Sequence, residues 1–289
     1  MTAMPAPRLR RFHQLDVFTA VPLRGNPLAV VHDAEGLDDA TMAAFARWTH
    51  LSETTFLLPP ADPAADYRVR IFTPGGELPF AGHPTLGSCH AWLAAGGQPR
   101  SAGQVVQECG VGLVTVRRDE AAGGRLAFAA PPLRRSGPLD EALLGRIAAA
   151  LGIDRGAIVQ HQWVDNGPGW CAVMLASGAA VRSLMPDMAA LALAELKLGV
   201  VGAQAAGADT AFEVRAFVPS MGIGEDPVTG SLNAGLAQWL IGAGLAPAAY
   251  VAAQGSALGR AGRVHVRHDG EHCWIGGDVA ACIEGTVTL

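Results

Sequence analysis

The sequence predicts an α+β protein built from two similar halves, each a curved, mostly antiparallel sheet around one central helix. Three observations predict this fold: a strand-like segment recurs once, the same short turn motif follows both copies, and an apolar helix follows each motif. The chain has 289 residues, 50% of them hydrophobic, so it can bury one large core or two medium ones. Two domains are the expectation.

The internal repeat is the first of these observations. The segment YRVRIFTP at 67–74 recurs 145 residues later as FEVRAFVP at 212–219. Three further pairs keep the same order: HPTLGS at 83–88 with DPVTGS at 226–231, GNPLAVV at 25–31 with GWCAVML at 169–175, and QECG at 107–110 with AAQG at 252–255. The alternative is that a β-rich chain reuses short strand-and-turn patterns, but four landmarks in one order favour a repeat.

The pattern of apolar residues predicts the elements of each half. Alternating segments predict half-buried strands at 67–72, 113–118, 124–130, 212–217 and 263–268. Segments with the spacing of surface helices lie at 37–48 and 185–196. The segments LGSCHAWLAAG at 86–96 and TGSLNAGLAQWLIGAG at 229–244 are apolar on nearly every face, so each predicts an enclosed helix.

The boundary between the halves is predicted at a proline-rich stretch. The N-terminal half is expected at 1–130, and the last C-terminal strand can complete it. The C-terminal half is expected at 139–289, and the linker is PPLRRSGP at 131–138.

Composition excludes several classes of partner and cofactor. The net charge is -5 and the basic residues are scattered, so neither nucleic acid nor a membrane surface is an expected partner. No segment approaches the roughly 20 apolar residues of a spanning helix, and no apolar stretch follows the basic N-terminus, so we expect a soluble, cytoplasmic protein. Five separated cysteines without a C-x-x-C pair argue against disulfides and a thiolate zinc site. No histidine or glycine motif supports a metal or dinucleotide, so we expect no metal and no cofactor.

The two enclosed helices predict a site for a small anion. Backbone N–H groups at a helix N-terminus have no partner within the helix, and together with the helix dipole they favour a carboxylate or phosphate. If a pseudo-twofold axis relates the halves, both N-termini can face one central cleft. The alternative is ordinary N-capping by hydroxyl groups with nothing bound, and the candidates for it are Thr85, Ser88, Thr229 and Ser231.

Two titratable residues occupy matching places in the repeat. His83 and Asp226 each stand just before the proline that opens the motif. An imidazole and a carboxylate that converge on one substrate can divide the acid and base roles or hold a substrate group. Singly, His83 is also compatible with a hydrogen-bonded turn and Asp226 with a capping role.

A third candidate, Glu53, opens the otherwise apolar segment SETTFLLP at 52–59. A carboxyl group buried there would have a raised pKa and could carry a proton near neutral pH. The matching segment VVG at 200–202 has no acid, so the proton chemistry would be asymmetric. The alternative is that Glu53 lies at the solvated end of a strand.

Four ordered motifs resemble a known family. They are GNPLAVV at 25–31, SETTFL at 52–57, FTPGGELPFAGHPTLGS at 72–88 and EDPVTGS at 225–231. In combination they are similar to the PhzF-like proteins of phenazine biosynthesis, relatives of diaminopimelate epimerase, from about residue 12 onward. The resemblance implies a diaminopimelate-epimerase-like fold with two pseudo-symmetric domains, and a homodimer.

The resemblance also implies a reaction and its residues. In the phenazine enzyme a glutamate transfers a proton during isomerisation of a dihydro-hydroxyanthranilate, and that residue corresponds to Glu53. His83 and Asp226 would complete the catalytic set. The implied substrate-binding residues, with backbone N–H groups of the two glycines on the substrate carboxylate, are Asn26, Gly82, Gly230 and Ser231.

Two features separate the chain from other members of this fold. Racemases of the epimerase branch use one cysteine at each motif, but the motifs here read AGH at 81–83 and EDP at 225–227. Leu232 also follows Ser231 where phenazine-pathway members commonly have histidine or another residue, so the sequence does not name the substrate.

We therefore expect a cofactor-independent isomerase that moves a proton within a small carboxylate substrate held between the halves. The alternatives are an epimerase or racemase that uses carboxylates instead of thiols, and a non-catalytic protein that binds small anions.

Overall fold

The computed structural model describes residues 7–219 and 223–289, so residues 1–6 of the expected N-terminal half lie outside the described part. The chain divides into two compact units. Unit 1 comprises Met1–Ala129 and Gly276–Leu289, and unit 2 comprises Ala130–Ile275. The stretch 131–138, expected as a linker, is counted with unit 2, and the C-terminal residues are counted with unit 1.

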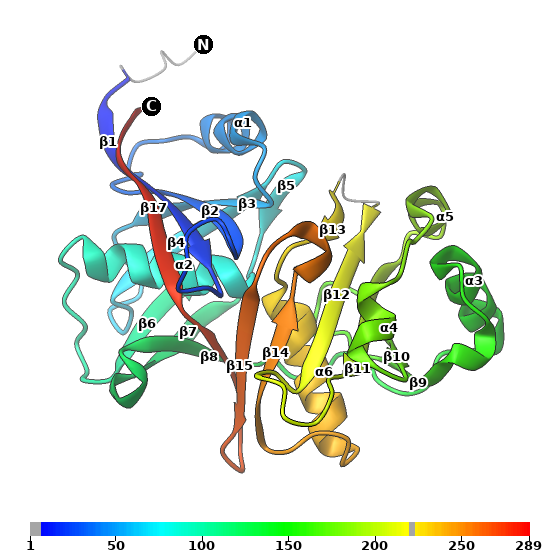
Figure 1. Cartoon of the computed structure of the whole chain (residues 1–289). Coiled ribbons are helices and arrows are strands. Elements are labelled where there is room, and N and C mark those ends of the chain that lie inside the picture. The colour runs from blue at the N-terminus through cyan, green and yellow to red at the C-terminus, as the bar shows by residue number, and fades with distance from the viewer. Residues whose placement is uncertain (1–6, 220–222) are drawn as a thin grey trace. The chain divides into compact units, whose positions relative to one another are not determined.

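Unit 1 contains a mixed, mostly antiparallel sheet (Figure 1). Its strands are β1 (Leu9–Val17), β2 (Asn26–Val31), β3 (Glu53–Leu58), β4 (Tyr67–Thr73), β5 (Gly76–Leu78), β6 (Gln104–Cys109), β7 (Gly112–Asp119), β8 (Arg125–Ala129) and β17 (Val279–Thr288). The pairs β2–β3 and β4–β6 are parallel, whereas β1–β2, β3–β4, β4–β5, β6–β7 and β7–β8 are antiparallel. The C-terminal strand β17 runs antiparallel to β1 from Leu9 to Val17, and Figure 1 shows the two side by side.

The helices of unit 1 are α1 (Asp39–Thr49) and α2 (Gly82–Ala94). Strands from across the sheet, including β1, β2, β3, β7 and β8, pack against α2, and most of its first ten residues are buried. The helix begins four residues before the expected segment 86–96, so His83 lies inside its first turn. Pro84 is tolerated there because the N–H that it lacks would have no partner within the helix.

Unit 2 has the same kinds of strand pairing. Its strands are β9 (Ile158–Trp163), β10 (Trp170–Leu175), β11 (Lys197–Ala203), β12 (Phe212–Val218), β13 (Ile223–Asp226), β14 (Ala249–Gln254), β15 (Gly262–His268) and β16 (Cys273–Gly277), the last of which runs across the unit boundary. The pairs β10–β11 and β12–β14 are parallel, whereas β9–β10, β11–β12, β12–β13 and β14–β15 are antiparallel. The strands and helices together confirm the expected α+β class.

The helices of unit 2 are α3 (Glu141–Leu151), α4 (Gly178–Arg182), α5 (Met188–Leu193) and α6 (Gly230–Gly242). The helix expected at 185–196 is shorter than predicted. It begins after Asp187, whose carboxylate accepts hydrogen bonds from the N–H groups of Ala189 and Ala190, and the chain turns at Glu195, which has a φ of 51°. The helix α6 begins one residue into its expected segment, and most of it is buried.

A similar ion pair between an arginine and a glutamate occurs in each unit. In unit 1 the guanidinium of Arg70 bonds both carboxylate oxygens of Glu77, at 2.8 and 2.6 Å. In unit 2 Arg215, which lies 145 residues later, bonds both oxygens of Glu225, at 3.0 and 2.7 Å. Each pair ties a short strand, β5 or β13, to the longer strand before it.

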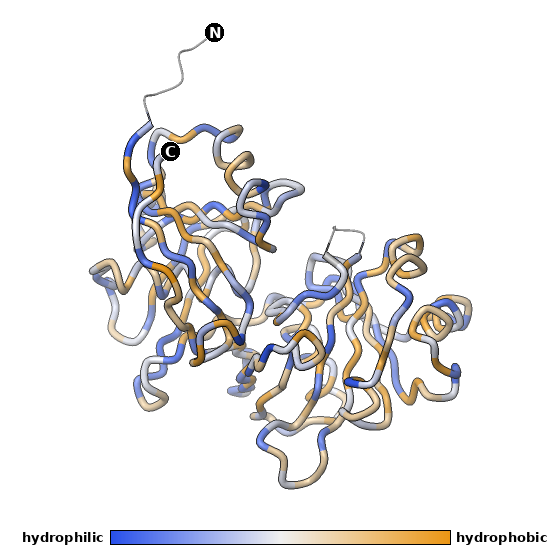
Figure 2. Tube along the Cα trace, turned by 45° about the horizontal axis from the view of Figure 1, so that its top comes forward, coloured by the Kyte–Doolittle hydropathy of each residue, from blue (hydrophilic) through white to orange (hydrophobic). Residues whose placement is uncertain are grey.

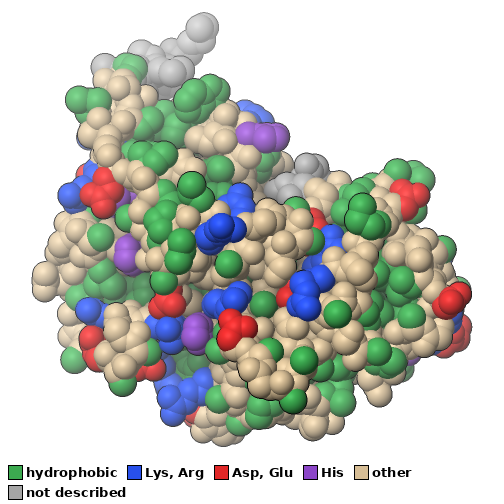
Figure 3. All heavy atoms as spheres, viewed as in Figure 1, with side chains coloured by type: hydrophobic (Ala, Val, Ile, Leu, Met, Phe, Trp, Pro, Cys, Tyr) green, Lys and Arg blue, Asp and Glu red, His purple; other side chains and the backbone are tan. Residues whose placement is uncertain are grey.

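Surface properties agree with the composition. Figure 2 shows hydrophobic and hydrophilic residues interspersed along the trace, and among the described residues no helix is both long and apolar enough to cross a membrane. Figure 3 shows acidic and basic side chains mixed on the face that it presents.

Candidate functional site

Three predicted residues of unit 1 lie together. Asn26 is the first residue of β2, Glu53 is the first residue of β3 and His83 is the second residue of α2. The Nε2 atom of His83 lies 3.5 Å from Oε2 of Glu53, and its Nδ1 atom lies 3.4 Å from Nδ2 of Asn26. The Glu53 side chain is only 15% exposed, so this carboxyl group lies largely away from solvent.

The ring of His83 is neutral at physiological pH. Burial lowers the pKa of His83 from 6.5 to about 3. A neutral imidazole has one donor and one acceptor nitrogen, and the amide nitrogen of Asn26, which only donates, faces Nδ1. With the Asn26 amide placed in this way, Nε2 is the nitrogen that carries the ring proton, and it is the nitrogen next to Glu53. In the described structure Nε2 of His83 and Oε2 of Glu53 are in contact but do not form a hydrogen bond, and the neutral ring adds no positive charge beside the carboxylate.

Backbone donors lie at the start of α2, where Gly82 is the first residue. The first hydrogen bond within the helix runs from the N–H of Thr85 to the carbonyl of Ala81, at 3.2 Å, so the N–H groups of Gly82 and His83 come before it. The residue at the cap, Ala81, has no side-chain oxygen with which to cap them.

The hydroxyl groups considered as caps of α2 have other partners. Thr85 donates to the carbonyl of Ala81 at 2.9 Å, and Ser88 donates to Oγ1 of Thr55 at 2.9 Å. Both residues lie inside the helix rather than ahead of it, so ordinary N-capping does not account for them.

The predicted residues of unit 2 lie at the end of β13 and the start of α6. Asp226 is the last residue of β13, and its Oδ2 atom accepts a hydrogen bond from the hydroxyl of Thr229 at 2.5 Å. Gly230 is the first residue of α6, and the first bond within that helix runs from the N–H of Asn233 to the carbonyl of Thr229. The N–H groups of Gly230 and Ser231 precede it, as in α2.

Two residues that hold Ser231 were missed by sequence reasoning. Trp170 donates its indole N–H to Oγ of Ser231 at 3.0 Å, and Asn166 donates to the carbonyl of Ser231 at 2.8 Å. The repeat contained a signal for the first, because the pairing of GNPLAVV with GWCAVML aligns Trp170 with Asn26. Asn26 contacts the second residue of α2, and Trp170 contacts the second residue of α6.

The thiols in the cores are unsuited to acid–base exchange. Burial raises the pKa of the Cys89 thiol well above its ordinary value, and burial raises the pKa of Cys171 to about 12. Both thiols therefore stay protonated at neutral pH. The oxygen and nitrogen groups described above are the ones arranged for chemistry.

The chain is similar to known proteins in both sequence and fold. Residues 15–285 match the family described as phenazine biosynthesis-like protein. The chain is 33% identical to antisense-enhancing sequence 1 of Schizosaccharomyces pombe over 95% of this chain and 97% of that protein. It is 33% identical to the trans-2,3-dihydro-3-hydroxyanthranilate isomerase of Pseudomonas aeruginosa over 97% of this chain and 100% of that enzyme. The crystal structure of a PhzF-family phenazine biosynthesis protein of Enterococcus faecalis superposes with a TM-score of 0.81 at 25% identity, covering 98% of this chain and 100% of that one.

Proposed function

The chain belongs to the family of phenazine biosynthesis-like proteins and is an enzyme of the isomerase class, and on that premise we propose that Glu53 moves a proton within a small carboxylate substrate. The contact between Glu53 and the neutral His83 is the observation that carries the proposal. A general base at such a position contributes about 10²- to 10⁴-fold to the rate.

The proposed step needs only groups of the protein and the substrate. The Glu53 carboxylate takes a proton from one substrate carbon, so a C–H bond breaks and an O–H bond forms, while the electron pair passes into the conjugated system of the substrate. The same carboxyl group then returns the proton to another carbon. A hydrogen bond from Nε2–H of His83, which lies 3.5 Å from Oε2 of Glu53, would stabilise the carboxylate when it is ionised. No cofactor takes part in this proposal.

The substrate carboxylate is proposed to bind to backbone N–H groups. The donors are those of Gly82 in unit 1 and of Gly230 in unit 2, with the hydroxyl of Ser231 beside the latter. Asp226 and Asn26 would orient the remaining polar groups of the substrate. That both helix starts serve one substrate, within a diaminopimelate-epimerase-like pair of pseudo-symmetric domains, is a prediction from the repeat and the resemblance.

Hydrogen exchange into substrate tests the role of Glu53. Wild type, Glu53→Gln and the matched control Glu120→Gln, which changes an exposed carboxylate of unit 1, are incubated in D₂O with small cyclic and amino-acid carboxylates. The panel includes trans-2,3-dihydro-3-hydroxyanthranilate, the compound in the name of the Pseudomonas relative. We expect NMR to show deuterium on a substrate carbon with wild type and Glu120→Gln, and at least 10²-fold slower with Glu53→Gln.

The outcome also separates the reaction types. A shift of a double bond changes the ultraviolet absorbance without optical inversion, whereas an epimerase inverts a stereocentre. Undiminished exchange in Glu53→Gln would overturn the assignment of the base. The homodimer implied by the resemblance also stays a prediction, which light scattering of the purified protein tests.

A further inference from the structure

A single buried amide organises the start of α6. Gln254 is the last residue of β14 and is fully buried. Its Oε1 atom accepts hydrogen bonds from the N–H of Thr229 at 3.0 Å and from Nδ2 of Asn233 at 2.8 Å. Its Nε2 atom donates to the carbonyl of Asp226 at 3.1 Å and to Oγ1 of Thr229 at 2.9 Å. All four hydrogen-bonding positions of the amide are therefore used.

The partners fix which way the amide of Gln254 points. The N–H of Thr229 can only donate, so the atom facing it must be the oxygen. The backbone carbonyl of Asp226 can only accept, so the atom facing it must be the nitrogen. A reversed amide would place donor against donor and acceptor against acceptor, at a cost of about 1–3 kcal/mol for each buried group left unsatisfied.

This orientation determines the direction of the next hydrogen bond. Oγ1 of Thr229 accepts a hydrogen bond from Gln254, so its own O–H is directed to Oδ2 of Asp226, 2.5 Å away. That separation is in the range of hydrogen bonds from a hydroxyl to a carboxylate. Hydrogen bonds thus run in one direction, from Gln254 through Thr229 to Asp226.

We propose that Gln254 is a positioning residue which, through the Thr229 hydroxyl, holds Asp226 as a hydrogen-bond acceptor in a fixed orientation. A carboxylate that accepts a hydrogen bond from the Thr229 hydroxyl on Oδ2 is stabilised in its ionised form, so it can accept a further hydrogen bond from a donor group of the substrate. The orienting role of Asp226 in this statement rests on the proposed function. The chain of bonds from Gln254 to Asp226 rests on the distances alone.

Unit 1 contains a related glutamine–threonine pair with a different end point. Gln107 is fully buried, donates to Oγ1 of Thr85 at 3.1 Å and accepts from the hydroxyl of Tyr67 at 2.8 Å. The hydroxyl of Thr85 donates a hydrogen bond to the backbone carbonyl of Ala81. At the start of α2 the threonine hydroxyl thus donates to a backbone carbonyl, whereas at the start of α6 the threonine hydroxyl donates to a carboxylate.

Substitution of Thr229 is the primary test. Thr229→Ser keeps the hydroxyl and Thr229→Val removes it at nearly constant volume. With the substrate found by deuterium exchange, we expect Thr229→Val to lower kcat/KM by about 10- to 100-fold, the range for a hydrogen bond to a charged group, and Thr229→Ser to stay within about 3-fold of wild type. Gln254→Met, measured alongside its thermal stability, is expected to follow Thr229→Val.

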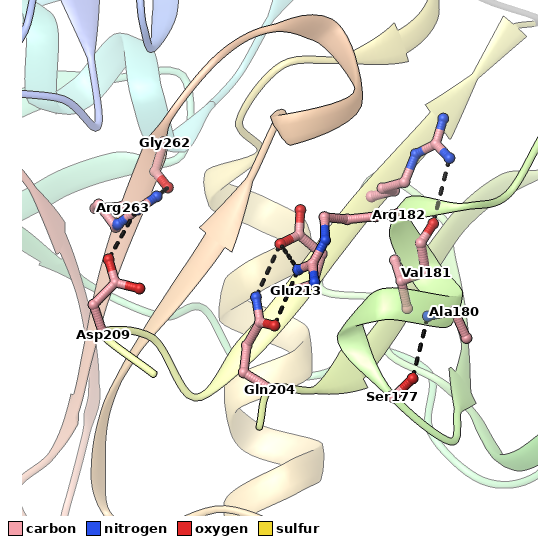
Figure 4. A network of polar contacts seen from close by, with 10 residues as sticks. Ser177, Ala180, Val181, Arg182, Gln204, Asp209, Glu213, Gly262 and Arg263 are labelled. Carbon is pink, nitrogen blue, oxygen red and sulfur yellow. Dashed lines mark hydrogen bonds and ion pairs between the residues drawn. The ribbon is translucent and has the colours of Figure 1, made fainter. Parts of the chain in front are cut away.

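A control for lost side-chain hydrogen bonds comes from Gln204, on the opposite face of the sheet. Gln204 bonds Glu213, which also bonds Arg182 (Figure 4). Glu213 is the neighbour of Val214, which pairs with Gln254, and successive residues of a strand point to opposite faces. We expect Gln204→Met to lower stability while kcat/KM stays within about 3-fold of wild type.

A second readout needs no substrate. The ¹³C resonance of the Asp226 carboxyl group, followed against pH in the free protein, is expected to titrate at higher pH in Thr229→Val than in wild type and Thr229→Ser. An unchanged titration in Thr229→Val would overturn the proposal. The Asp226 titration can also shift in a protein that exchanges no substrate proton. That result would support the chain of hydrogen bonds from Gln254 to Asp226 and refute the proposed function. Equal losses of kcat/KM in Thr229→Ser and Thr229→Val would also overturn the proposal that Gln254 positions Asp226 through Thr229.

Discussion

A buried pair of histidines in unit 1 is expected to make that unit sensitive to acid. His13, on β1, and His32, directly after β2, are both nearly inaccessible, and Nδ1 of His13 lies 2.8 Å from Nε2 of His32. The accepting ring of this hydrogen bond must be neutral, and burial lowers the pKa of both histidines below 6.5, so both rings are neutral at pH 7. Burial lowers the pKa of His32 from 6.5 to about 4, with further lowering by His13 and Arg11 and partial compensation by Asp33.

The surroundings of His13 also favour its neutral form. Burial lowers the pKa of His13, and the carboxylate of Glu284 on β17 opposes this only in part. His90 on α2 also has a pKa lowered by burial first and by His13 second. These groups give the pair no charged partner strong enough to favour its protonated form.

The sign and size of the effect follow from the pKa of His32. The unfolded chain binds a proton at His32 below pH 6.5, whereas the folded chain does so only near pH 4. The stability contributed by the neutral ring is therefore fully present above pH 6.5 and is lost progressively as the pH falls from 6.5 to about 4. Between pH 7 and pH 5 the loss at this one site is about 2 kcal/mol.

Hydrogen exchange of β1 and β2 measures this loss in unit 1 by itself. The opening free energy of these strands is determined at pH 7 and pH 5 for wild type, His32→Gln and the control His50→Asn, which changes an exposed histidine in the left-handed cap of α1. We expect His32→Gln to lose about 2 kcal/mol less than wild type and His50→Asn to behave as wild type. An equal loss in all three proteins would refute the reasoning.

Two further predictions concern unit 2. Arg215→Met should lower the free energy of unfolding, measured by urea denaturation, by about 3–5 kcal/mol, because it leaves the nearly inaccessible Glu225 without its guanidinium partner. The double variant Arg215→Met/Glu225→Leu should recover part of this loss. Gly235→Ala should cost at least about 1–3 kcal/mol, because the added Cβ would lie 2.2 Å from the carbonyl oxygen of Val164, whereas Gly145→Ala, with open space around its Cβ, should raise the melting temperature. A Gly235→Ala variant as stable as wild type would contradict the packing argument.

Much of the fold was predictable because apolar periodicity and the repeat report backbone geometry directly. The strands β4 and β12 lie where the alternating segments predicted them, and the enclosed helices α2 and α6 follow the turn motifs. The start of α2 was misplaced because proline usually marks a boundary, and only the geometry of the first turn shows that Pro84 is accommodated.

The candidate site was predicted less completely. Glu53, His83 and Asp226 stand out in sequence because they are polar residues beside apolar segments. The role of Gln254 was not predictable, because a glutamine at the end of a strand is ordinary until its four partners are located. The pair His13–His32 was missed for a similar reason, since only the register of β1 against β2 brings the two rings together.

The pairing of β1 with β17 has a consequence for how the chain reaches this fold during synthesis. Unit 2 is one continuous segment, so all of its partners have been made once Ile275 has left the ribosome. Unit 1 is not continuous, because all of unit 2 lies along the chain between β1 and its partner β17. The β1 edge that β17 will cover must wait through the synthesis of about 260 intervening residues, roughly 10–50 s at ordinary rates of translation. During that interval the nascent chain has an unpaired strand edge. Such an edge can pair with the wrong strand or with another chain, and chaperones limit this misassembly.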